Sequence, residues 1–205
     1  SRKGTPMPQE TQNRIKRIEK ELNAVLYTMA DGVVITDMEG IITYANPQAE
    51  KILGMHRNKI ENAYYFDNKW KQINEEGNPL KPEELPVAVA LKHKKSVKDF
   101  IHGITDGEGN TKWLAVSVSL MRNEGEDFFG ALAYFRDITG QRNREKDLKD
   151  AAEYYLTLFD QLPTPKMRFD QRGQCNYVNY AWTQLTGRSV KEENGAGWIE
   201  GIHKE

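Results

Sequence analysis

Residues 31–49 read DGVVITDMEGIITYANPQA, and this stretch carries the clearest local signals in the chain. A β-rich run at residues 33–36 and a second at residues 41–44 flank four turn-forming residues. Asn46 and Pro47 follow, and these residue types are favoured at the N-cap and the first position of a helix. The stretch therefore predicts a β-hairpin that leads into a short helix, which we expect to end at Gly54.

The residues after this hairpin predict helices and then three more strands. Residues 56–80 show no regular period, although aromatic residues gather between 64 and 70. Pro82 begins a helix that we expect to continue to about Lys94. The later strands are predicted at residues 100–105, 113–120 and 128–135. Two strands, then helices, then three strands predict an α+β fold with one antiparallel sheet of five strands.

Two amphipathic helices flank this unit. In the first, apolar residues at steps of three and four form an a/d seam, which consists of Ile15, Ile18, Leu22, Val25 and Met29. A second seam runs through residues 138–162, and its early half is polar because it contains Gln141 and Glu145. We expect the first seam to be buried, either on its own domain or, as we favour, in a homodimer that pairs through both helices.

The chain contains an internal repeat. A shift of 133 residues without gaps places Asp37 on Asp170, Gly40 on Gly173, Tyr44 on Tyr177, Asn46 on Asn179 and Gly54 on Gly187. We therefore divide the chain into a tail and helix (1–29), a complete domain (30–139), a helical linker (140–162) and the N-terminal part of a second domain (163–205). The second copy lacks counterparts of the last three strands. We expect the chain to be a piece of a longer protein, and the truncated copy to fold poorly alone.

These segments resemble the PAS domain family. Residues 31–37 and 40–49 are similar to its opening, residues 82–91 to its central helix, and residues 113–117 to a late strand. Residues 135–139 are similar to its closing strand and Asp-Ile-Thr motif. The resemblance implies a five-stranded antiparallel sheet with helices on one face and with the first and last strands side by side at the centre. It also implies a role in sensor histidine kinases, diguanylate cyclases or transcriptional regulators.

The resemblance further implies which side chains point toward the pocket that such domains often use for a small molecule. The candidate ligand-binding residues are Val34, Thr36, Ile42, Phe100, His102, Ile104, Leu114, Val116, Val118, Ala133 and Phe135. A packed core without a ligand explains the same apolar pattern. His102 is the titratable exception, and it either finds a partner in the core or meets a ligand.

The cofactor, if there is one, stays unknown. Haem is not expected, because a single inward histidine is weak evidence for a haem-binding site. Flavin of the light-sensing kind is not expected either, because that chemistry uses a cysteine in the early helical region and residues 46–95 contain none. No metal site is predicted.

Residues 137–139 are the candidate signal relay. Asp137 and Thr139 are both good cap residues, so we expect one of them to cap the linker helix. Ile138 lies between them, and we expect its side chain to pack on the sheet and so hold the connection between the last strand and the linker helix in place. The alternative is that these residues only end the strand.

Composition excludes several classes of function. The net charge of −1, from 29 basic and 30 acidic residues, argues against contact with nucleic acid or membrane. The single cysteine, Cys175, fits a reducing compartment, so we expect a cytoplasmic protein. Phosphate-binding loop and cyclase motifs are absent from the sequence. We therefore expect a non-catalytic module, either a ligand-responsive sensor or a ligand-free dimerisation module, with an output enzyme such as a histidine kinase outside it.

Overall fold

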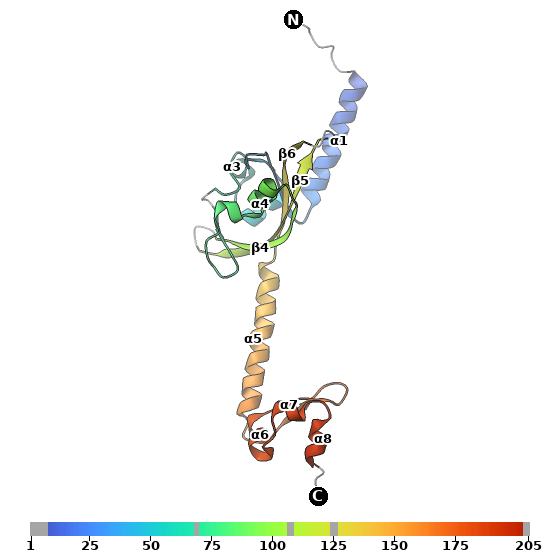
Figure 1. The fold of residues 1–205 in the computed structure, drawn as a ribbon. Coiled ribbons are helices and arrows are strands. Elements are labelled where there is room, and N and C mark those ends of the chain that lie inside the picture. Colours follow the sequence, from blue (N-terminus) through green and yellow to red (C-terminus); the bar gives the residue numbers. More distant parts are fainter. Residues whose placement is uncertain (1–7, 68–69, 106–108, 124–126, 203–205) are drawn as a thin grey trace. The chain divides into compact units, whose positions relative to one another are not determined.

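The computed structural model describes residues 8–67, 70–105, 109–123 and 127–202. The chain divides into two units, Ser1–Arg142 and Asn143–Glu205 (Figure 1).

An antiparallel sheet with the strand order β2-β1-β6-β5-β4-β3 forms the centre of the first unit. Its strands are β1 (Gly32–Thr36), β2 (Ile42–Ala45), β3 (Lys71–Ile73), β4 (Val97–Thr105), β5 (Thr111–Arg122) and β6 (Phe128–Asp137). The first and last strands are central neighbours, with Val34 opposite Ala133, as the resemblance to the PAS domain family implied. The α+β fold with an antiparallel sheet is thus confirmed.

The number of strands differs from the prediction, because the sheet has six strands and not five. The additional strand, β3, lies in the stretch without a period and pairs with β4, so that Gln72 lies opposite Ile104. It contains only three residues, which is too short for an alternating pattern to appear in the sequence.

Helices cover one face of this sheet. They are α2 (Pro47–Leu53), α3 (Arg57–Ile60), the 3₁₀ turn η1 (Pro82–Glu84) and α4 (Pro86–His93). α2 packs on β1 and β6, whereas α4 packs on β4, β5 and β6. Figure 1 shows α3 and α4 on the same side of the sheet.

The prediction of one helix from Pro82 to about Lys94 was wrong. The helix is interrupted at Leu85, whose backbone is extended with φ −70° and ψ 145°. The cause is Pro86, since a proline ring disfavours the helical conformation of the residue before it. The second segment then begins with proline at its first position, where the missing N–H is tolerated.

Asn46 connects three elements of the first unit. Its Oδ1 accepts hydrogen bonds from the backbone N–H of Ala49 at 2.8 Å and of Val33 at 2.9 Å. Its Nδ2 donates to the carbonyls of Leu26 and Asp31, both at 3.1 Å. The side chain is fully buried. It therefore caps α2 and also holds the end of α1 (Gln9–Thr28) against β1.

The apolar seam of α1 is exposed in the single chain. The exposed fractions are 41% for Ile15, 52% for Ile18, 57% for Leu22, 59% for Val25 and 37% for Met29. The alternative that this seam packs on its own domain is therefore wrong, and the homodimer stays a prediction.

The second unit contains most of α5 (Thr139–Gln161), the hairpin β7 (Met167–Phe169) and β8 (Cys175–Val178), α6 (Tyr180–Thr186), α7 (Val190–Glu193) and α8 (Gly197–Ile202). Asn179 repeats the role of Asn46, because its Oδ1 accepts from the N–H groups of Lys166 and Trp182. Its Nδ2 donates to the carbonyls of Phe159 and Leu162 at the end of α5.

Candidate functional site

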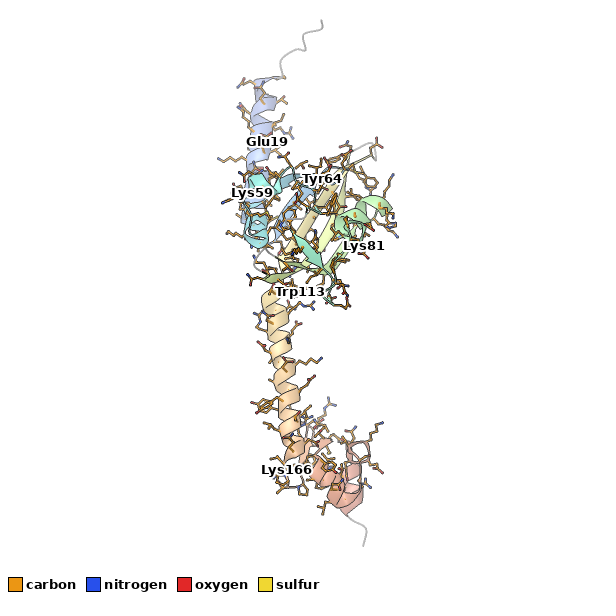
Figure 2. All side chains as sticks on the ribbon, turned by 90° about the vertical axis from the view of Figure 1, so that its left-hand side faces the viewer. Glu19, Lys59, Tyr64, Lys81, Trp113 and Lys166 are labelled. Carbon is orange, nitrogen blue, oxygen red and sulfur yellow. The ribbon has the colours of Figure 1, made fainter. Side chains whose placement is uncertain are left out.

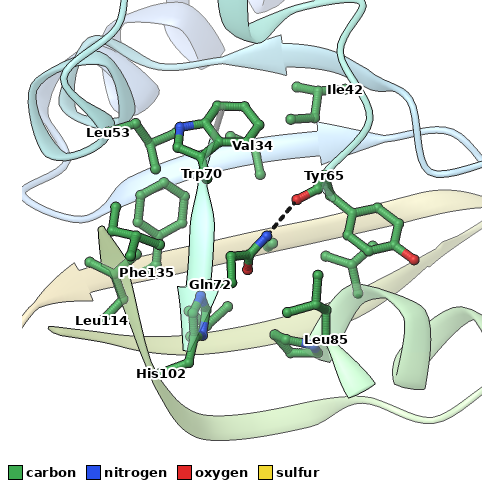
Figure 3. Close-up of a pocket in the computed structure, with 15 residues that line it drawn as sticks. Val34, Ile42, Leu53, Tyr65, Trp70, Gln72, Leu85, His102, Leu114 and Phe135 are labelled. Carbon is green, nitrogen blue, oxygen red and sulfur yellow. Dashed lines mark hydrogen bonds between the residues drawn. The ribbon is translucent and has the colours of Figure 1, made fainter. Parts of the chain in front are cut away.

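A cavity of about 80 Å³ lies between the inner face of the sheet and the helical layer of the first unit (Figure 3). Eight of the candidate ligand-binding residues line it: Val34, Ile42, His102, Ile104, Leu114, Val116, Ala133 and Phe135. The structure thus brings these side chains together, whereas binding of a ligand by them stays a prediction.

Three candidates do not line the cavity. Thr36 and Val118 are buried further along the sheet. Phe100 is half-buried, and its ring lies 5.8 Å from the ring of His102. Just before it, β4 contains a bulge at which Asp99 adopts a φ of +49°.

The other lining residues were not among the candidates, because no strand was predicted in the segments that carry them. They are Leu53 at the end of α2, Tyr65, Trp70, Gln72 on β3, Leu85, Pro86 and Val87. The gathering of aromatic residues between 64 and 70 was the one signal that could have pointed to part of this set.

The cavity contains a few polar groups in an apolar wall. His102 is 4% exposed and Trp70 is 8% exposed. Neither His102 Nδ1 nor Trp70 Nε1 has a hydrogen-bond partner among the residues that the structure describes. Gln72 is anchored, because its Nε2 donates to the carbonyl of Tyr65 at 3.0 Å (Figure 3).

Burial controls the charge of His102. It lowers the pKa of the imidazole from 6.5 to about 4, because the protonated ring would lose its hydration. The side chain is therefore neutral at pH 7, with one ring nitrogen as a donor and the other as an acceptor.

Acidification should destabilise the first unit through this histidine. In the unfolded chain the ring binds a proton below pH 6.5, whereas the folded chain does so only near pH 4. The free energy of unfolding should consequently fall as the pH drops through this window, by about 3 kcal/mol at pH 4. Urea unfolding at pH 7 and pH 4 would measure the change. His102→Gln should lack this component, while His93→Gln, at an exposed position, should keep it.

The start of α5 is held by three hydrogen bonds, two of which join it to β5. The backbone N–H of Trp113 donates to Thr139 Oγ1 at 2.8 Å, and the N–H of Ile138 donates to the carbonyl of Trp113 at 2.8 Å. The N–H of Thr139 donates to Asp137 Oδ1 at 2.9 Å. Asp137 therefore caps the helix, Thr139 ties it to the sheet, and half-buried Ile138 lies between them. Figure 2 shows Trp113 at this junction.

A second attachment, which the sequence did not indicate, involves Arg142 in the first turn of α5. Its Nη1 lies 2.6 Å from Glu75 Oε2, and its guanidinium lies 4.4 Å from the centre of the Trp113 ring. Glu75 belongs to the turn that follows β3. The first turn of α5 is thus fastened both to β5 and to the turn after β3.

Comparison with known sequences identifies the fold and its repeat. Residues 30–140 match the sequence profile of the PAS domain, and residues 153–204 match a second PAS domain profile. The chain belongs to the PAS domain family. PAS domains are in general non-catalytic sensory modules, and the cavity lies in the first of the two.

Two curated relatives of this PAS region are a sensor protein and a signal transduction histidine-protein kinase. The chain is 30% identical over 147 residues to the alginate biosynthesis sensor protein KinB of Pseudomonas aeruginosa, covering 72% of this chain and 22% of that protein. It is 28% identical over 131 residues to the signal transduction histidine-protein kinase AtoS of Escherichia coli, covering 62% of this chain and 19% of that protein. The chain therefore spans about a fifth of the length of these relatives.

A solved structure shares the fold. The structure of an RNA-binding light-oxygen-voltage receptor superposes with a TM-score of 0.53 at 15% identity, covering 74% of this chain and 42% of that one. At this level of identity the likeness concerns the PAS fold alone.

The residues around the cavity do not fit the large cofactors that some PAS domains hold. At about 80 Å³ the cavity is roughly half the size of one that admits benzene, so neither flavin nor haem fits it. Within the described residues there is no group of three metal-ligating side chains. None of the described helices has the length and apolar character that crossing a bilayer requires.

Proposed function

We propose that this tandem PAS region is the ligand-responsive, non-catalytic sensory part of a larger protein, a cytoplasmic portion of a sensor histidine kinase. The observation that carries the proposal is a short path from the cavity to the helix that leaves the domain. Gln72 lines the cavity on β3, and Glu75, three residues later, holds Arg142 of α5. A shift of β3 on ligand binding would therefore act directly on the first turn of that helix.

A second path runs through β5. Leu114 lines the cavity, and Trp113, next to it, forms the hydrogen bonds to Ile138 and Thr139. Lys112, one residue further, donates from Nζ to the carbonyl of Ile52 in α2 at 2.8 Å. Three consecutive residues of one strand thus contact the cavity, the output helix and the helical layer, which supports a coupled movement of all three.

The far end of α5 is also held, within the second unit. Asn179 donates to the carbonyls of Phe159 and Leu162, and Asp160 Oδ1 accepts from the backbone N–H of Tyr180 at 2.8 Å. A helix that is fastened at both ends passes on a rotation or a tilt that a loose loop would absorb. We infer that the second PAS copy receives the signal through α5.

Homodimerisation is part of the proposal. The exposed seam of α1 offers an apolar face to a second copy. Leu148 and Tyr155 on α5, and Leu162 directly after it, are also exposed apolar residues. The small cavity favours one alternative function, a ligand-free module that only dimerises and sets the register of the linker.

The joint can be tested with the double substitution Asp137→Ala and Thr139→Ala. It removes the cap and the tie to Trp113, so the free energy of unfolding should fall by about 1 kcal/mol while the sheet stays folded. In the intact receptor the output should no longer follow its stimulus, as measured by autophosphorylation with and without the stimulus.

The matched control is Asp147→Ala with Thr157→Ala, which changes the same residue types at exposed positions in the middle of α5. It should leave the response unchanged. A normal response of the Asp137→Ala, Thr139→Ala protein would show that signals do not pass through this joint, and the dimerisation module would then be the better description.

A further inference from the structure

The ring of Phe135 rests on a glycine. Phe135 of β6 lies directly opposite Gly32 of β1 in the sheet. A β-carbon at Gly32 would overlap with Cε2 of the ring and would lie only 2.7 Å from Cζ. Gly32 does not adopt a positive φ, so its backbone conformation is open to other residues. The absence of a side chain here therefore makes room for the ring, and the backbone itself does not require glycine.

The other inward neighbours of Phe135 in the sheet all line the cavity. They are Val34, Leu114, Val116 and Ala133. Phe135 is 5% exposed and is itself part of the cavity wall (Figure 3). A ring displaced from Gly32 would therefore move over these neighbours and reduce the cavity, because the surrounding core is closely packed.

This pair of residues also lies beside the end of α1 and the start of α5. The carbonyl of Asp31, directly before the glycine, accepts from Asn46 Nδ2, which also holds the end of α1. The Asp31 carboxylate lies 3.4 Å from Nε of Arg136, the residue after the phenylalanine. Asp137, one residue further, caps α5. A displacement of the ring would thus act on residues that hold both helices.

We propose that Phe135 couples the contents of the cavity to α5, and that Gly32 determines how much of the cavity the ring leaves open. With the ring against Gly32, the cavity has space for a small molecule. A molecule that fills this space presses on the ring and so on the end of β6. This inference rests on the proposed sensory function and adds a positioning residue to it, on a third path beside those through β3 and β5.

Xenon is a suitable probe, because it is uncharged, smaller than benzene and binds apolar protein cavities. It would be titrated as dissolved gas into the ¹³C- and ¹⁵N-labelled chain while the methyl signals of Val34, Leu114 and Val116 are followed. These signals should shift in a saturable way in the wild type. Gly32→Ala should weaken xenon binding at least about tenfold, because the displaced ring of Phe135 then occupies the space.

A second variant separates the position of the ring from a loss of folding. Gly32→Ala together with Phe135→Leu lacks Cε2 and Cζ, the two ring atoms that a β-carbon would approach most closely. This chain should fold and regain xenon binding, even if Gly32→Ala alone does not fold. Unchanged xenon binding by Gly32→Ala, no binding by the double variant, or no saturable shift in the wild type would each overturn the role of Gly32.

The coupling to α5 is read from the backbone amide of Thr139, which donates to Asp137 Oδ1 at the end of β6. Xenon should shift this amide signal in the wild type. Phe135→Leu should still bind xenon but lose the shift, whereas Ile104→Val, which shortens a lining residue of β4, should keep it. Retention of the shift in Phe135→Leu, or its loss in both variants, would overturn the role of Phe135. The relay proposal is tested separately by the joint variants in the intact receptor, so it can stand if this inference fails.

Discussion

Asn46→Ala is expected to lower the free energy of unfolding of the first PAS domain by about 4 kcal/mol. The substitution removes the cap of α2 and the acceptor of the Val33 N–H, and it leaves the carbonyls of Leu26 and Asp31 without their donor. A loss of this size is a large part of the stability of a typical domain. Urea unfolding, followed by the signals of Trp70 and Trp113 in this unit, would measure it.

Two controls separate this anchor from a general effect of removing an asparagine. Asn58→Ala changes an exposed side chain of α3 and should alter the free energy of unfolding by less than about 0.5 kcal/mol. Asn179→Ala removes the equivalent anchor of the second unit, so it should disturb Trp182 and Trp198 and spare Trp70. A loss below about 1 kcal/mol for Asn46→Ala would show that the four hydrogen bonds are readily replaced by water.

The first hairpin and the helix after it could be predicted because single residues determine where the helix begins and ends. Asn46 caps α2, and Gly54 ends it with a φ of +67°, a conformation that other residues rarely adopt. The break at Leu85 was equally present in the sequence, since Leu85 precedes Pro86 and a proline disfavours the helical conformation of the residue before it. The edge strand β3 left no such signal, because three residues are too few to show a period.

The candidate site was predictable only where strands contribute to it. Alternation groups the positions within each strand, and the family resemblance implies which group points inward. His102, Val116 and Phe135 were expected to point inward on this basis, and all three line the cavity. The other wall comes from the end of α2, the residues around β3 and the start of α4. These elements are short or only their ends reach the cavity, so the sequence shows no period from which the direction of these side chains could be read. The pairing of Glu75 with Arg142 spans 67 positions, and no local pattern indicates such a contact.

The internal repeat predicted the backbone path of the second copy but not the residues that fill its core. Asn179 caps α6 and Gly187 ends it in the left-handed conformation, as Asn46 and Gly54 do for α2 in the first copy. Glu193, by contrast, is 1% exposed and accepts hydrogen bonds from Trp182 Nε1 at 3.1 Å and Arg188 Nε at 2.9 Å. The 133-residue shift places Glu193 on Ile60, a buried apolar residue of the first copy. Residues that determine the backbone path thus recur, whereas those that fill the core do not.

Replacing Ile18 and Leu22 together by glutamate is expected to dissociate the homodimer that we propose. Both side chains are more than half exposed in the single chain, and their spacing places them on the a/d seam of α1. Burial of such a side chain contributes about 1.5–3 kcal/mol, and a dimer would lose four of them. The dissociation constant should therefore rise at least about 1000-fold, the equivalent of about 4 kcal/mol. Sedimentation equilibrium of the wild-type and variant chains would show it.

The control for this change is Asn23→Glu with Ala24→Glu. It introduces the same two charges on the opposite face of α1, and glutamate is a good helix former, so the helix should persist in both variants. The control should remain dimeric, while Ile18→Glu with Leu22→Glu sediments as a monomer with unchanged helix content. A wild-type chain that is monomeric at high micromolar concentration would contradict the dimer. Equal dissociation by both variants would instead show that the added negative charge, and not the seam, is responsible.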